Sequence, residues 1–73
     1  MVDTKNDYQH PEFVVFCIEV YKAEKGITGK ESYNILKDTG AINFIDDCYE
    51  ALHCMGSKAI VEDIDEYIKN HSL

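Results

Sequence analysis

The hydrophobic positions of this chain recur at helical spacing in stretches that are separated by glycines. The first stretch begins at Pro11, which suits the first turn of a helix because the missing N–H has no intrahelical partner there. It continues without a helix breaker from Glu12 to Lys25 and stops at Gly26. Its apolar side chains cover more than one stripe, which predicts a central helix that is contacted on several sides.

The next two stretches predict two further helices. Thr28-Gly29-Lys30-Glu31 is a capping-box pattern, in which the threonine hydroxyl and the glutamate carboxylate each satisfy a free backbone N–H. The helix that starts at Thr28 should be about three turns long, and Gly40 is suited to the left-handed conformation that ends it. In the third stretch Asn43 is a candidate N-cap, and apolar residues at i, i+3, i+4 and i+7 indicate a helix that ends at Gly56.

Residues 57–61 fit two structures. Ser57 could cap one long fourth helix, or Ala59-Ile60-Val61 could form a short extended segment before a helix that begins near Glu62 or Asp63, and we favour the extended segment. Three or four short helices with short connections predict an all-α fold, a small bundle with roughly antiparallel neighbours. We expect this single helical domain over residues 11–70, after a loose polar arm at residues 1–10.

Charge narrows the functions that such a bundle could serve. The 73 residues include 14 acidic and seven basic side chains, so the formal net charge is −7, and every basic residue is a lysine. Arginine is the side chain best suited to bidentate contacts with phosphate and guanine, so its absence disfavours direct nucleic-acid binding. The acidic excess favours a basic partner instead.

The residues that could carry chemistry form no catalytic or metal-binding pattern. The three cysteines come with no signal peptide and no apolar run long enough for a membrane, which predicts reduced thiols in a cytoplasmic protein. Cys17 and Cys48 fall on apolar helix faces, whereas Cys54 is the thiol expected at the surface. His53 and Cys54 would diverge by about 100° on a helix, and the C-x₂-C spacing of zinc sites is absent. We therefore expect no enzyme activity, cofactor or metal site.

The segment from Ile60 to Ile68 has the pattern of a binding surface. Val61, Ile64 and Ile68 share one helix face, whereas four carboxylates project from the other side. The hypothesis is helix-in-groove docking, in which an apolar stripe gives affinity and the charges steer a cationic partner. The expected contacts are Glu62, Asp63, Asp65 and Glu66 for steering, with Tyr67 and Ile68 as anchors. An ordinary solvated helix face is the competing interpretation.

Four blocks of sequence together resemble a small bacterial family of unknown function. The blocks are Phe16-Cys17-Ile18-Glu19, Ile27-Thr28-Gly29-Lys30-Glu31, Tyr49-Glu50-Ala51-Leu52-His53 and Ile60-Val61-Glu62-Asp63-Ile64-Asp65-Glu66-Tyr67-Ile68. Members of that family are short stand-alone proteins, often encoded beside proteins that resemble ADP-ribosyltransferase toxins. The resemblance implies an antitoxin-like or accessory partner of such a toxin, and it brings no activity and no binding residues with it.

Two other functions stay open. A self-associating homodimer could bury the C-terminal apolar stripe and leave the acids to provide solubility. A helix-turn-helix could form around Gly40, but the helix that would enter the DNA groove, Phe44 to Cys54, carries three acids and no basic residue. The sign of that charge disfavours DNA binding.

Overall fold

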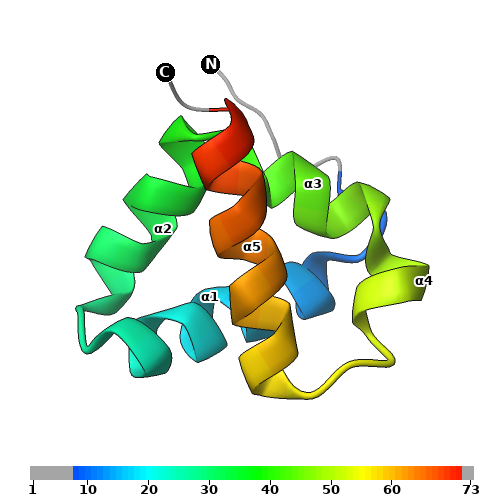
Figure 1. The fold of residues 1–73 in the computed structure, drawn as a ribbon, viewed down its shortest axis with the longest axis horizontal. Helices are drawn as coiled ribbons and strands as arrows, with labels where there is room; N and C mark the ends of the chain where they lie inside the picture. Colours follow the sequence, from blue (N-terminus) through cyan, green and yellow to red (C-terminus); the bar gives the residue numbers. More distant parts are fainter. Residues whose placement is uncertain (1–7, 72–73) are drawn as a thin grey trace.

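Helices form the regular secondary structure of this chain in the computed structural model, which describes residues 8–71. In chain order they are α1 (Pro11–Lys25), α2 (Gly29–Asp38), α3 (Ala41–Asp47), α4 (Tyr49–Leu52) and α5 (Ser57–His71). Figure 1 shows α5 crossing in front of α1, with α2 on one side and α3 and α4 on the other. The predicted all-α bundle is confirmed, with the single turn α4 as an additional element.

Local sequence signals set the limits of α1 and α2 as predicted. Pro11 is the first residue of α1, and Gly26 ends that helix in the left-handed conformation, with a φ of 66°. The Thr28 hydroxyl accepts a hydrogen bond from the Glu31 N–H at 3.1 Å, and the Glu31 carboxylate accepts one from the Thr28 N–H at 3.0 Å. Gly40, with a φ of 80°, then turns the chain from α2 into α3.

The predicted third helix is wrong in its start and in its continuity. It begins at Ala41, directly after Gly40, because Ala41 and Ile42 are both buried and Asn43 is exposed. It is interrupted at Cys48, whose φ of −102° and ψ of 24° lie outside the helical region. The segment 44–54, considered as a DNA-reading helix, is therefore the end of α3, the single turn α4 and the turn that follows.

The extended segment favoured at residues 57–61 is also wrong. These residues form the first turns of α5, where the Ile60 N–H donates to the Gly56 carbonyl at 3.0 Å. Ile60, Val61 and Ile64 are all buried, and a helix brings the positions i, i+1 and i+4 to one side whereas a strand would divide them. Tertiary burial therefore outweighs the β-branched composition of this segment.

The expected arm at residues 1–10 is held against the helices over its last three residues; residues 1–7 lie outside the described part of the chain. Tyr8 packs on the core. The two carboxylate oxygens of Asp46, in α3, accept hydrogen bonds from the backbone N–H groups of Gln9 at 2.9 Å and His10 at 2.8 Å. These two hydrogen bonds fix the position of the backbone that leads into α1.

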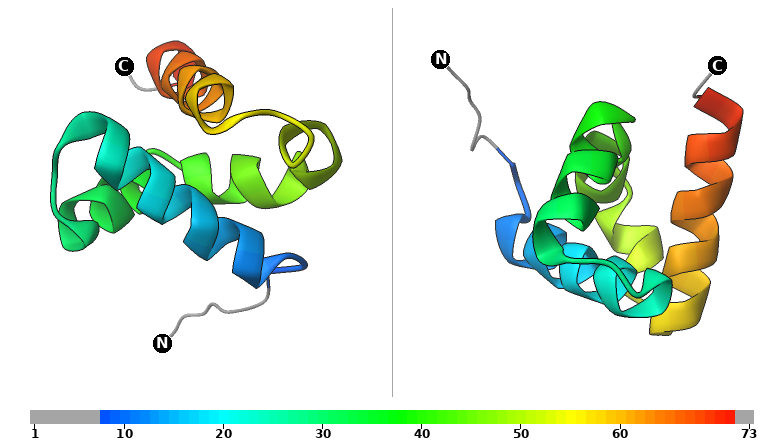
Figure 2. Two further views of the ribbon diagram at one scale, coloured as in Figure 1. Left: turned by 90° about the horizontal axis from the view of Figure 1, so that it is seen from below. Right: turned by 90° about the vertical axis from the view of Figure 1, so that its left-hand side faces the viewer.

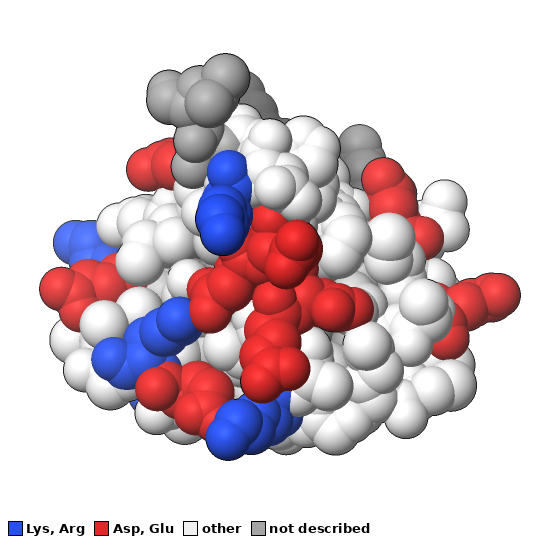
Figure 3. Space-filling view, in the orientation of Figure 1, with Lys and Arg blue, Asp and Glu red and all other residues white. Residues whose placement is uncertain are grey.

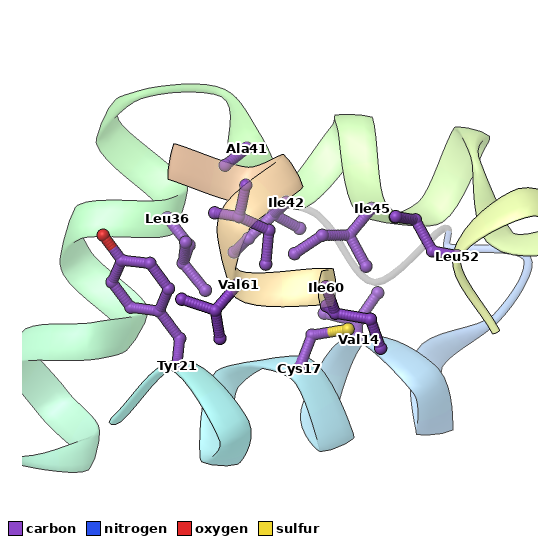
Figure 4. Close-up of a cluster of buried hydrophobic side chains, with 11 residues drawn as sticks. Val14, Cys17, Tyr21, Leu36, Ala41, Ile42, Ile45, Leu52, Ile60 and Val61 are labelled. Carbon is purple, nitrogen blue, oxygen red and sulfur yellow. The ribbon is translucent and has the colours of Figure 1, made fainter. Parts of the chain in front are cut away.

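The hydrophobic core lies where α1, α3 and α5 meet, and each of these helices contacts the other two; Figure 2 shows their arrangement in two further views. Side chains from all five helices converge there in Figure 4. The buried apolar side chains are Val14, Cys17, Tyr21, Leu36, Ala41, Ile42, Ile45, Leu52, Ile60, Val61 and Ile64. Ser32 is buried with them, and its hydroxyl donates to the Ile18 carbonyl at 2.9 Å, which joins α2 to α1. Within residues 8–71 no helix has the length and apolar character needed to span a membrane.

Candidate functional site

The predicted binding segment is one helix, α5, with two different faces. Its buried face is part of the core, and Glu62 and Glu66 are exposed on the opposite side. Asp63 and Asp65 lie at the two margins and are partly exposed. In Figure 3 the carboxylates gather over α5 at the centre of the view, with lysines at the edges of the red patch.

Asp65 is engaged within the fold. Its Oδ2 accepts from Lys25 Nζ at 2.6 Å, and its Oδ1 accepts from the Tyr21 hydroxyl at 3.1 Å. Burial, reinforced by the hydrogen bond and the charge of Asp65, raises the pKa of Tyr21 to about 12. Asp65 therefore fixes α5 to α1, and of the four acids expected to steer a partner, Glu62, Asp63 and Glu66 remain outside these contacts.

The expected anchors Tyr67 and Ile68 are half-buried against the rest of the chain. The Tyr67 ring stacks between Phe44, at a centroid distance of 4.5 Å, and His71, at 4.1 Å. Ile68 packs against the core. The apolar stripe that helix-in-groove docking or a homodimer would bury is thus largely covered by the chain itself, so the accessible side of α5 is its acidic side.

We call Glu62, Asp63 and Glu66 the outward acidic face of α5. Within residues 8–71, no basic side chain lies within 4.0 Å of these three carboxylates to form an ion pair. Their position on one side of a helix creates a concentrated negative potential that attracts cations and raises the rate of association with a basic surface. The chemistry available here is electrostatic recognition.

A groove that the sequence did not predict lies between the start of α1 and α4. It encloses about 640 Å³ and is lined by rings from both segments. His10 stacks on Tyr49 at 3.8 Å between ring centroids, and Tyr49 stacks on His53 at 4.5 Å. The i, i+4 spacing of Tyr49 and His53 could have indicated the second contact, but no sequence signal brings His10 to Tyr49.

The cysteines occupy the environments that the sequence predicts. Cys17 is buried, which raises the pKa of its thiol to about 12, Cys48 is half-buried and Cys54 is exposed. The Cys54 Sγ lies 3.9 Å from Nδ1 and 3.8 Å from Nε2 of His53, although the two side chains were expected to diverge. Because Sγ is about equally far from both nitrogens, it does not lie along the lone-pair direction of either one. Within residues 8–71 no three potential metal ligands come together.

Comparison with known proteins identifies one family. Residues 12–71, most of the chain, match the family described as Protein of unknown function (DUF3791). The searches of curated proteins and of solved structures gave no match. The resemblance to a family of unknown function is thereby confirmed, and we conclude that the chain belongs to the DUF3791 family.

Proposed function

We propose that this protein is a non-catalytic binding module whose outward acidic face of α5 occupies a basic surface of a partner protein. The observation that supports this proposal is the division of α5: its apolar side is fixed in the core, and three carboxylates project from the other side. A surface that is already folded loses little conformational freedom on binding. Exposed charges then contribute mainly to association rate and selectivity.

The mode of binding that we propose is surface docking. In helix-in-groove docking the partner would cover an apolar stripe, but here Ile60, Val61 and Ile64 are buried inside the chain. The partner would therefore present lysine or arginine side chains to Glu62 and Glu66 across a partly hydrated interface. Occupation of a basic site on the partner would block access of an anionic substrate to that site.

The partner that we propose is an ADP-ribosyltransferase-like toxin in the bacterial cytoplasm, with this chain as its antitoxin-like or accessory protein. The resemblance described above supports this choice, since it implies a gene neighbourhood with proteins that resemble such toxins. The charge is compatible with it, because an enzyme that binds an anionic dinucleotide presents cationic groups, and a row of carboxylates is complementary to them.

A pull-down from the lysate of the native host tests the proposal. The tagged protein is compared with the variant E62Q/D63N/E66Q at low and moderate salt, and captured proteins are identified by mass spectrometry. A matched control, E24Q/D38N/D47N, removes the same number of charges from exposed positions on α1, α2 and α3. We expect a stoichiometric basic protein with the native chain and the control, and weak recovery with the α5 variant and at higher salt.

Two results would contradict the proposal. Equal recovery with the α5 variant would show that the outward acidic face does not make the contact. Recovery of the bait alone at both salt concentrations would favour a self-contained oligomer, which light scattering over a dilution series would then detect as a mass that rises with concentration.

A further inference from the structure

The groove between α1 and α4 combines aromatic walls with one negative charge. Its rings come from His10, Phe13 and Phe16 on one side and from Tyr49 and His53 on the other. Among its described lining residues Glu12 is the only acidic side chain, and no lysine takes part. The start of α1 and α4 lie at the same end of the molecule in Figure 1.

The rings of the groove are ordered as a stack. The planes of His10 and Tyr49 are inclined by 10°, and those of Tyr49 and His53 by 8°. Phe13 closes the side of the stack, because its ring meets Tyr49 edge to face at 5.2 Å between centroids. His10 and His53 cover the two faces of Tyr49, so a further planar group would stack on the exposed ring of Phe16 or on the outer face of a histidine at the end of the stack.

The charges around the groove determine whether the planar group should be a cation or an anion. The N-terminus of α1 would by itself favour an anion, but two carboxylates already lie beside it: Glu12 is in the first turn, and Asp46 accepts hydrogen bonds from the N–H groups of Gln9 and His10, which precede the helix. Glu12 and Glu50 add negative charge on α1 and α4. Aromatic faces are also negative, so a cation gains from both the rings and the carboxylates.

We propose that this groove binds an arginine side chain presented by a partner protein. A guanidinium is planar, permanently charged and weakly hydrated, so it can stack on a ring while it donates to a carboxylate such as that of Glu12. The ammonium group of lysine is a compact and strongly hydrated charge that cannot continue a stack. The groove shares no residue with the outward acidic face of α5, and this proposal does not rest on the proposed function.

The test is an NMR titration with three short peptides. Ac-Gly-Arg-Gly-NH₂ is the probe, the citrulline peptide has a neutral group of the same shape, and the phenylalanine peptide represents an aromatic occupant. We expect the arginine peptide to shift the ring signals of Phe13, Phe16 and Tyr49 saturably in the millimolar range. The citrulline peptide should shift them much less at the same concentration.

Substitutions at exposed positions test whether the arginine peptide binds in the groove, and they should not disturb the fold. Phe16 is 47% exposed and Glu12 is also exposed, so F16L and E12Q should fold normally and should each weaken the arginine peptide about fivefold. V15A is the matched control, because Val15 is 58% exposed on the same helix but does not line the groove. Its affinity should equal that of the native chain.

Three results would overturn the proposal. If the citrulline peptide binds equally well, the charge of the ligand is not recognised. If the phenylalanine peptide binds more tightly, the groove selects an aromatic side chain. If the arginine peptide shifts only the signals of α5, or none, the groove is not the site of the cation.

Discussion

The contacts of Asp65 allow a quantitative test of how α5 is fixed to α1. The substitution D65N keeps the size of the side chain and removes its charge. The ion pair with Lys25 is lost, and because the two side chains are 40% and 37% exposed, solvent limits this loss to about 0.2–1 kcal/mol. The hydrogen bond from Tyr21 then goes to a neutral acceptor, which costs about 0.5–1 kcal/mol more. The free energy of unfolding should fall by about 1–2 kcal/mol, out of about 4–11 kcal/mol for a chain of this length.

Urea unfolding followed by circular dichroism measures this loss. A double-mutant cycle with D65N and Y21F should give a coupling of about 0.5–1 kcal/mol, since the two side chains contact each other directly. A tyrosinate titration adds a second measurement, in which the Y21F spectrum is subtracted to isolate Tyr21. In D65N the pKa of Tyr21 should fall from about 12 toward 10.0 but stay above it, because burial is the larger cause of the shift.

The exposed neighbour Glu62 supplies the control. E62Q should change the free energy of unfolding by less than about 0.5 kcal/mol and leave the Tyr21 titration unchanged. If D65N and Y21F were strictly additive, or if D65N left the pKa of Tyr21 at about 12, Asp65 would not be the residue that joins α5 to α1.

Three further predictions concern stability. I64A removes a side chain with 0% exposure from the middle of α5 and should cost about 2–5 kcal/mol in urea unfolding, whereas a loss below 1 kcal/mol would contradict the packing of this helix. Burial raises the pKa of Cys17 from 9.0 and of Tyr21 from 10.0, each to about 12, so the folded chain favours the neutral forms of both groups. Their contribution to stability should be present in full at neutral pH and should be lost as the pH rises from 9 to 12, and an unfolding midpoint that does not change over that range would disprove this linkage. T28A breaks the capping box and should cost about 1 kcal/mol in thermal unfolding, clearly more than T39A at the other end of α2; equal effects would show that the cap is not significant.

The parts of the fold that were predictable from sequence are those fixed by neighbours along the chain. Pro11 and Gly26 limit α1, and the Thr28 and Glu31 pair starts α2, because a missing N–H, a left-handed φ and a capping hydrogen bond each involve only a few consecutive residues. The acidic side of α5 was predictable for the same reason, since periodicity alone separates its two faces.

The sequence-based predictions were wrong where contacts between residues far apart in the chain determine the structure. Cys48 is neither glycine nor proline, and nothing in its neighbourhood marks the end of α3. After that break, the Tyr49 ring lies between those of His10 and His53, so the interruption accompanies a contact across 39 positions of the chain. The expected steering role of Asp65 was inaccurate for the same reason. In the sequence Asp65 is one of four similar acids, and only the fold brings Lys25 close to it.

Because Gln9 and His10 donate hydrogen bonds to Asp46, the groove forms only when α1, α3 and α4 are packed together. One carboxylate on α3 positions the residues that precede α1, and α4 supplies the facing rings. A synthetic peptide that copies residues 8–25 would therefore lack both the support of His10 and half of the aromatic wall. The backbone amides of Gln9 and His10 would also report local opening of this end in hydrogen exchange, at a lower free energy than the amides of the core helices.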